Sequence, residues 1–286
     1  MRPSILRTVA LTLGLLVSPA TQAAEVAVDY EVFGSGPTHV LVLHDWLGDR
    51  ANYDPIRPYL SPDKFTYAFI DLRGYGGSKD VSGEYTSSEA AADALSVADA
   101  LGWETFSIVG HSMTGMVVQR VAAFAPTRVE KIVATTPVGA KGLMVDEETY
   151  DFFATATGDP EAMAQALGLL TGNRLSPAWI AFKVDRGMKR STEAARLAYL
   201  DMFDKEDFSA DVSGLKTPVL ALLGANDLGA FQPENIEATF GAWYPNLTVV
   251  VSENAGHYPM QETPPFYATT IEAFLSPEEA ESTGSQ

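Results

Sequence analysis

Short runs of apolar and β-branched residues alternate with helical segments over most of this 286-residue chain. The stretch "TFSIVG" (105–110) follows the alanine-rich helical stretch "TSSEAAADALSVADALGW" (86–103) and precedes the apolar helical stretch "MTGMVVQRVAAFAP" (113–126). Near-continuous apolar strands that alternate with helices are typical of a parallel sheet covered on both faces. The sequence therefore predicts an α/β fold with a mostly parallel, doubly wound sheet. Further strands are predicted within 26–34, 39–43, 65–70, 131–139, 219–223 and 246–252.

The strand pattern stops between residues 140 and 213, where helical patterns with acidic and aromatic residues take over. We expect this segment to be a helical cap inserted between two strands of one sheet, so that the core consists of 24–139 and 214–276. The predicted cap helices are Glu147–Thr155, Pro160–Leu170, Pro177–Met188 and Thr192–Phe203.

Both ends of the chain differ from the core in composition. Arg2 and Arg7 precede an apolar run from Val9 to Val17, and small residues follow near Ala23. This pattern predicts a secretory signal peptide over 1–23, because the run is much shorter than the about 20 apolar residues of a membrane anchor. We therefore expect a periplasmic or secreted protein. The polar residues 277–286 are expected to form a disordered tail.

Charge and cysteine content narrow the classes of function. The chain contains no cysteine, which excludes disulfides, thiolate nucleophiles and cysteine-ligated zinc. Its formal net charge is −18, and such a surface repels nucleic acid and anionic lipid. We expect a small-molecule substrate, no nucleic acid and no stable membrane association, whereas the sequence leaves the oligomeric state open.

The stretch "GHSMTG" (110–115) nearly matches G-x-S-x-G, in which a serine occupies a strained turn between a strand and a helix. Ser112 lies directly between a predicted buried strand and an apolar helix, as that turn requires. Thr114 stands where the motif has glycine, and its β-branch crowds the turn. Ser112 is thus a candidate nucleophile, and it needs a base held by a third group.

His257, in the loop after the last apolar strand, is the best-placed base among the four histidines. His111 is adjacent to Ser112 in the chain and is badly placed to reach its hydroxyl. The orienting acid should follow a strand between serine and histidine in sequence, and Asp227 does so. Glu253 is a weaker rival.

With Ser112, Asp227 and His257 each at a strand end, the chain resembles the α/β-hydrolase family, and within it the cap-bearing serine esterases and lactonase-like members. The resemblance covers about Val26 to Leu275. It implies that Ser112 is the nucleophile, His257 the general base and then acid, and Asp227 the orienting carboxylate, with the cap as a lid. In "DLRGYGGS" (71–78) the glycines are interpreted as structural and Arg73 as an ion-pairing residue.

An oxyanion hole needs two N–H groups aimed at the developing negative oxygen. The resemblance assigns one to Met113. It assigns the other to Trp46, in "HDWLGD" (44–49), which is similar to the family's His-Gly turn. Asp45 replaces the usual glycine there, so we expect its side chain to point away from the hole or to pair with a cation.

Five cap aromatics recur at helical spacing and suit a cap core, although some should line an apolar acyl site. The five are Phe152, Phe153, Trp179, Phe182 and Phe203. Of these, Phe153, Trp179 and Phe182 are the candidate substrate contacts. The sequence shows no cofactor motif or metal-ligand spacing, and the proposed chemistry needs no cofactor. The leading hypothesis is hydrolysis of small carboxylic esters or lactones. The alternatives are a carbon–carbon bond hydrolase or cofactor-free perhydrolase with the same triad, or a ligand-binding protein with a vestigial triad.

Overall fold

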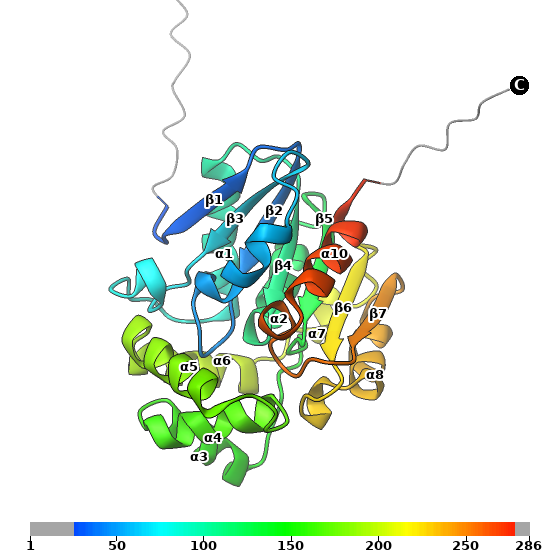
Figure 1. The fold of residues 1–286 in the computed structure, drawn as a ribbon. Helices are drawn as coiled ribbons and strands as arrows, with labels where there is room; N and C mark the ends of the chain where they lie inside the picture. The colour runs from blue at the N-terminus through cyan, green and yellow to red at the C-terminus, as the bar shows by residue number, and fades with distance from the viewer. Residues whose placement is uncertain (1–25, 278–286) are drawn as a thin grey trace, which may run out of the picture.

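The computed structural model describes residues 26–277 of the chain. These residues form a seven-stranded sheet in the order β1-β3-β2-β4-β5-β6-β7 (Figure 1). β1 runs antiparallel to β3, and the other neighbouring pairs are parallel, which confirms the predicted mostly parallel sheet. The strands are β1 (Tyr30–Gly34), β2 (Thr38–Leu43), β3 (Phe65–Ile70), β4 (Phe106–His111), β5 (Val129–Thr135), β6 (Val219–Gly224) and β7 (Leu247–Ser252).

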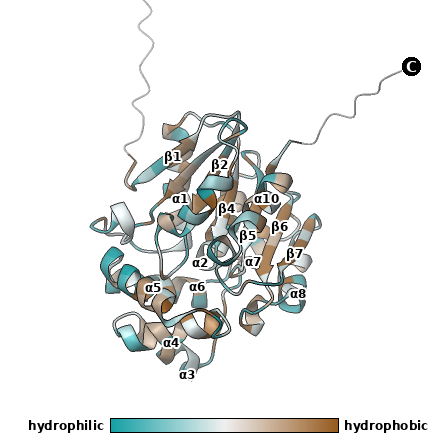
Figure 2. Cartoon of the chain, viewed as in Figure 1, coloured by the Kyte–Doolittle hydropathy of each residue, from teal (hydrophilic) through white to brown (hydrophobic). Residues whose placement is uncertain are grey.

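The centre of the sheet is the apolar core. Every residue of β4 and of β6 is buried, whereas β7 at the edge has a single buried residue. In Figure 2 the strands carry mostly hydrophobic colours, and the surrounding helices combine both kinds of residue. Burial on both faces explains why these strands read as continuous apolar runs rather than as alternating ones.

Helices flank this sheet. α1 (Ser87–Ala100) packs against α2 (Met113–Phe124), while α10 (Pro264–Leu275) packs against the 3₁₀ helix η1 (Arg50–Tyr59). The hydroxyl of Thr86 accepts the N–H of Glu89 in the first turn of α1, and Gly102 follows the helix at φ 70°. The 11-residue helix α8 (Pro233–Trp243) was not predicted, and it lies between β6 and β7 in sequence.

The expected cap helices form between β5 and β6 and lie together at one end of the sheet (Figure 1). They are α3 (Glu147–Ala156), α4 (Pro160–Leu170), α5 (Pro177–Arg190) and α6 (Glu193–Lys205), and the short α7 (Ser209–Val212) follows. We call residues 140–213 the cap. Each of its four long helices begins after a side chain that accepts a backbone N–H of the first turn, namely Asp146, Asp159, Ser176 and Thr192.

Loops at the carboxyl ends of the parallel strands hold the predicted functional residues. Ser112 directly follows β4, Asp227 lies three residues after β6, and His257 lies five residues after β7. Carboxyl ends of parallel strands meet at one edge of a sheet, so the topology gathers these residues beneath the cap. The predicted signal peptide (1–23) and residues 278–286 of the predicted tail lie outside the described residues. Among residues 26–277, no helix is long and apolar enough to span a bilayer.

Candidate active site

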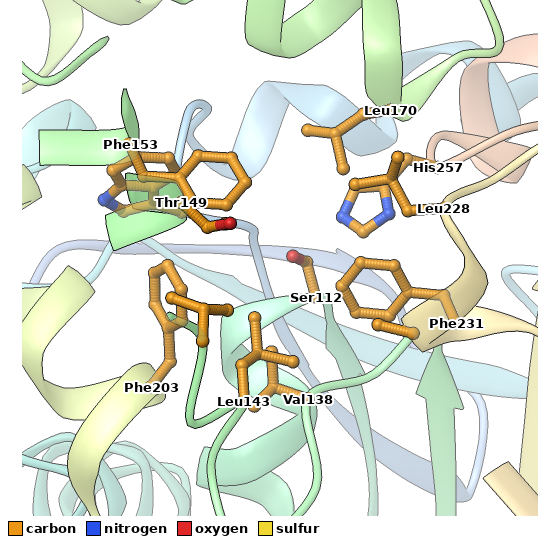
Figure 3. A pocket seen from close by; sticks show the side chains of 13 residues that line it. Ser112, Val138, Leu143, Thr149, Phe153, Leu170, Phe203, Leu228, Phe231 and His257 are labelled. Carbon is orange, nitrogen blue, oxygen red and sulfur yellow. The ribbon is translucent and has the colours of Figure 1, made fainter. Parts of the chain in front are cut away.

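Ser112 occupies a strained turn between β4 and α2, with φ 56° and ψ −115°. Such a conformation costs a non-glycine residue about 1–3 kcal/mol and persists only where the surroundings enforce it. Here the N–H of Ser112 donates to the carbonyl of Thr135 (2.9 Å), and the Ser112 carbonyl accepts the N–H groups of Gly115 and Val138 (both 2.9 Å). These bonds hold the turn so that the Ser112 hydroxyl projects into a cavity under the cap (Figure 3).

Thr114, the departure from the glycine of the motif, fits the turn because its hydroxyl is fully engaged. Thr114 Oγ1 accepts the N–H of His111 (2.8 Å) and lies within hydrogen-bond distance of the carbonyls of His111 (3.0 Å) and Leu43 (3.2 Å). The close approaches fall instead on Gly110 and Gly115, where an added Cβ would collide with the Thr114 backbone and with Pro137. Glycine is therefore required on either side of Thr114 rather than at it.

Asp227 and His257 form a buried hydrogen-bonded pair. His257 Nδ1 lies 2.6 Å from Asp227 Oδ2, and the two side chains are 2% and 0% exposed. Asp227 Oδ1 accepts the N–H of Leu228 (2.7 Å), which fixes the rotation of the carboxylate. Because His257 Nδ1–H donates its hydrogen bond to the carboxylate, Nε2 is left as the hydrogen-bond acceptor on the cavity side.

The other candidate acid and the other histidines do not take the place of Asp227 and His257. Glu253 is exposed, so the structure brings Asp227 rather than Glu253 to the histidine. His39 stacks on Trp103 with ring centroids 4.6 Å apart, on a different part of the sheet. His111 Nε2 donates to the His257 carbonyl (2.6 Å), and burial is the main cause that lowers the pKa of His111 to about 3. His111 is therefore a neutral support for the His257 backbone.

Hydrogen bonds from the cap and from Glu262 fix the loop that carries His257. The His257 N–H donates to the carbonyl of Leu170 at the end of α4 (3.0 Å). Glu262 Oε1 accepts the N–H groups of Gly256 (2.9 Å) and Tyr258 (3.1 Å), and its Oε2 pairs with Arg174 after α4 (2.8 Å). Glu262 was not predicted as a site residue. The signal for it in the sequence was an acidic residue five positions after the candidate histidine, close enough to accept backbone N–H groups of the same loop.

The predicted oxyanion-hole donors belong to two backbone segments at Ser112. Met113 is the first residue of α2, and the first N–H groups of a helix lack intrahelical acceptors. Trp46 shares a peptide unit with the Asp45 carbonyl, which accepts a hydrogen bond from His44 Nδ1 (2.7 Å). His44 Nε2 accepts the N–H of Leu72 (3.1 Å), so both ring nitrogens are engaged and Nδ1 is the donor. His44 thereby fixes the direction of the Trp46 N–H.

The Asp45 side chain behaves as expected. It hydrogen-bonds to Asn52 Nδ2 and to the Tyr258 hydroxyl (2.8 Å), and a buried cation, Lys183, lies beyond Asn52. Neither oxygen of this carboxylate borders the cavity, because Asp45 is absent from the residues that line it.

The cavity next to Ser112 has a volume of about 200 Å³ and almost entirely apolar walls. Besides Ser112 and His257, its one polar lining side chain among the described residues is Thr149 of α3, and none of the lining residues carries a fixed charge. The walls come from the cap and from the loops after β2, β5 and β6, and include Trp46, Val138, Leu143, Leu170, Phe203 and Phe231. Figure 3 shows most of these side chains around Ser112. The lining residues in the loops after β5 and β6 were not predicted. For Phe231, its position four residues after Asp227 was a signal that the sequence offered.

The structure brings one of the three predicted substrate contacts to the cavity. Phe153 lines the cavity, but Trp179 and Phe182 do not. Trp179 packs edge-on against Tyr258 at 5.4 Å between ring centroids, and the side of α5 that carries Phe182 faces outward, leaving Phe182 56% exposed. Phe203, which was weighed as cap core, lines the cavity as well and packs against Trp46.

The loop "DLRGYGGS" has the structural role that was predicted for its glycines. Gly74 and Gly76 adopt φ 80° and 51°, a region that favours glycine. Arg73, whose partner could not be identified from the sequence, binds Asp93 of α1 (2.7 Å) and lies 3.6 Å from Glu89. This loop lies beside the site without contributing to the cavity walls.

Comparisons with known proteins agree with this architecture. Over 265 residues the chain is 26% identical to the pimeloyl-[acyl-carrier protein] methyl ester esterase of Nitrosomonas europaea, covering 86% of this chain and 99% of that protein. A thermophilic esterase from Thermogutta terrifontis superposes with a TM-score of 0.74 at 25% identity, covering 87% of this chain and 92% of the other. The enol-lactonase of Burkholderia xenovorans superposes with a TM-score of 0.75 at 23% identity, covering 87% and 96%, which shows the shared fold.

The sequence profile of the alpha/beta hydrolase fold matches residues 38–264, which is most of the chain. That match takes in β2 to β7, the cap and all three residues of the Ser112, Asp227 and His257 group. With its esterase-like relatives and a hydrolase site architecture, this chain belongs to the α/β-hydrolase family.

Proposed function

We propose that this protein is a serine hydrolase of small, uncharged carboxylic esters or lactones. The observation that carries the proposal is the buried Asp227–His257 pair, which shares with the strained Ser112 turn one apolar cavity. A serine hydroxyl needs a base oriented by a third group, and these residues meet that requirement in the chain order serine, aspartate, histidine that is typical of the fold.

In the proposed mechanism Ser112 Oγ attacks the substrate carbonyl while His257 Nε2 takes its proton. Asp227 holds the imidazole in the required tautomer and stabilises it once it is protonated. The N–H groups of Met113 and Trp46 stabilise the oxyanion. His257 then donates the proton to the leaving alcohol, and the same residues activate a water that cleaves the acyl-serine and restores the enzyme.

The walls of the cavity support a small apolar acyl group as the substrate. A volume of about 200 Å³ lies below the roughly 300–1,000 Å³ of sites for drug-sized ligands. The walls offer no cation to bind a second carboxylate. Two of the similar proteins are a methyl ester esterase and an enol-lactonase, which also fits a small leaving group or a cyclic ester.

The proposal is tested by hydrolysis rates on 4-nitrophenyl esters from acetate to decanoate, with Ser112→Ala as the background. We expect kcat/KM to be highest for acetate to butyrate and to fall for longer chains, because these exceed the cavity. Turnover equal to the Ser112→Ala background on every ester and on simple lactones would reject the proposal.

Leu143 is expected to limit the acyl length. It lines both the cavity and a neighbouring surface groove of about 460 Å³, and with Ala230 it forms their shared wall. Leu143→Ala should open the cavity into this groove and raise the kcat/KM ratio of octanoate to acetate by about tenfold or more, since each added methylene in an apolar site is worth roughly 1–3 kcal/mol.

The matched control for this variant is Leu169→Ala, which truncates an exposed leucine of the cap that lines neither space. We expect the control to keep the wild-type chain-length profile. An unchanged profile in Leu143→Ala would show that the wall between cavity and groove does not set the acyl length.

A further inference from the structure

The turn after β2 buries a negative charge next to one of the proposed oxyanion donors. Asp45 is 2% exposed and directly precedes Trp46. Burial acts to raise its pKa, but the charge of Lys183 and the hydrogen bond from Tyr258 lower the pKa below the usual value of an aspartate. Asp45 is therefore ionised at neutral pH. An uncompensated carboxylate here would oppose the negative charge that develops on the substrate oxygen.

The cap places a buried cation opposite this carboxylate. Lys183 of α5 is 1% exposed, and its Nζ donates to Asn52 Oδ1 (2.7 Å). The same Asn52 side chain donates through Nδ2 to Asp45 Oδ1, so one amide joins the ammonium group to the carboxylate. Lysine is almost never fully buried unless it is paired. The cap and the core are thus linked by a water-excluded pair of opposite charges.

Aromatic rings complete the surroundings of the ammonium group. Lys183 Nζ lies 4.3 Å from the centroid of the Tyr258 ring and 5.9 Å from that of Trp179. Cations are attracted to such ring faces, most strongly where water is excluded. Tyr258 directly follows His257 and donates its hydroxyl to Asp45 Oδ2, so the group reaches both the oxyanion turn and the base loop.

We propose that Lys183 is a positioning residue that compensates the Asp45 charge and thereby makes the cap an electrostatic part of the catalytic centre. This inference rests on the proposed hydrolase function. Lys183 does not line the cavity, so it acts through Asn52, Asp45 and the backbone at Trp46 rather than on the substrate. Removing its charge leaves a buried, unpaired carboxylate beside the reaction.

The test compares Lys183→Met with the double variant Asp45→Asn/Lys183→Met, using full-length protein and the preferred 4-nitrophenyl ester. We expect Lys183→Met to lower kcat by about tenfold or more with little change in KM, because the loss falls on transition-state charge. The double variant should return to within about threefold of the wild-type kcat, since replacing both members of a buried charge pair is often neutral.

The pH dependence of kcat separates electrostatics from packing. The titratable groups facing Asp45 are Lys183, His44, His111, Tyr53, Tyr75 and Tyr258. Lys183 also faces Asp49 and Arg186, and His257 faces Asp227, His111 and Tyr258. An uncompensated Asp45 carboxylate favours the protonated imidazole, so the acidic limb of the profile should move to higher pH in Lys183→Met. It should return to the wild-type position in the double variant.

Arg190→Gln is the matched control. Arg190 is a cation of the same helix that pairs with Asp49 of the same turn (3.0 Å), but its side chain is 47% exposed. We expect this variant to keep the wild-type kcat and pH profile, because Arg186 still pairs with the buried Asp49 (2.7 Å) when the half-exposed Arg190 is replaced.

The outcomes distinguish the inference from the function on which it rests. Absence of Ser112-dependent turnover in the wild type overturns both. Equal kcat and pH profiles in the wild type and in a folded Lys183→Met variant overturn the inference alone, as does a double variant that recovers nothing. If Lys183→Met does not fold, as followed by thermal unfolding, the folded double variant decides: near wild-type kcat supports charge compensation and a large loss contradicts it.

Discussion

Replacement of Ser112 by alanine is expected to reduce ester hydrolysis by roughly 10⁵- to 10⁶-fold, to the rate left by the oxyanion donors and binding alone. The reason is structural as well as chemical. Ser112 is the residue that the strained turn holds at the cavity surface, and close packing at Gly110 and Gly115 leaves no room for a Cβ at either position. Alanine keeps the turn and removes only the hydroxyl.

Two measurements check this expectation. The first is kcat on the preferred ester, and the second is covalent labelling by a fluorophosphonate, read as a mass increase located on the peptide that contains Ser112. The wild type should be labelled and Ser112→Ala should not. Ser88→Ala, which removes an exposed hydroxyl from α1, serves as the control and should behave as the wild type. Labelling that persists in Ser112→Ala would identify another nucleophile.

The sheet was predictable because its strands are buried on both faces. β4 and β6 read as unbroken apolar runs, and the cap helices between them begin after side chains that accept first-turn N–H groups, such as Asp146 and Ser176. Helix α8 escaped prediction, and its first turn has no side-chain cap. Its single strongest signal was Pro233 at the first helical position.

The position of the candidate catalytic residues was also predictable from the sequence, because topology alone brings the carboxyl ends of parallel strands together. Ser112, Asp227 and His257 follow three such strands, so their proximity required no knowledge of side-chain packing. The choice between Asp227 and Glu253 did require it, since both follow strands. Only the three-dimensional path of the loops leaves Glu253 exposed and turns Asp227 inward.

The orientation of the cap could not be read from hydrophobicity. Phe182 and Lys183 are neighbours on α5, and the apolar residue was expected to be the buried one. The structure does the opposite: Phe182 is exposed and Lys183 is enclosed. Lys183 can be buried because Asp45 and Asn52, more than 130 positions earlier in the chain, supply its partners. A long-range polar contact of this kind leaves no local pattern in the sequence.

Asp227→Asn is expected to lower kcat by about 10⁴-fold with little change in KM. The Leu228 N–H requires an acceptor at the Oδ1 position (2.7 Å), so the asparagine should keep its carbonyl oxygen there and place its NH₂ group where Oδ2 now meets His257 Nδ1. An N–H donor at that position forces the histidine into the Nε2–H tautomer. His257 then presents a proton to Ser112 instead of an acceptor, and the serine cannot be activated.

Glu253→Gln is the paired measurement, because it makes the same chemical change in the rival carboxylate on an exposed loop position. Its kcat should equal that of the wild type. The reverse result, with Asp227→Asn active and Glu253→Gln inactive, would mean that the base is oriented by a loop arrangement different from the one described. A similar loss in both variants would point to the general acidity of this edge of the sheet. The structure argues against both of these outcomes. His257 and Asp227 form a buried 2.6 Å contact, whereas Glu253 has no comparable contact with the imidazole among the described residues.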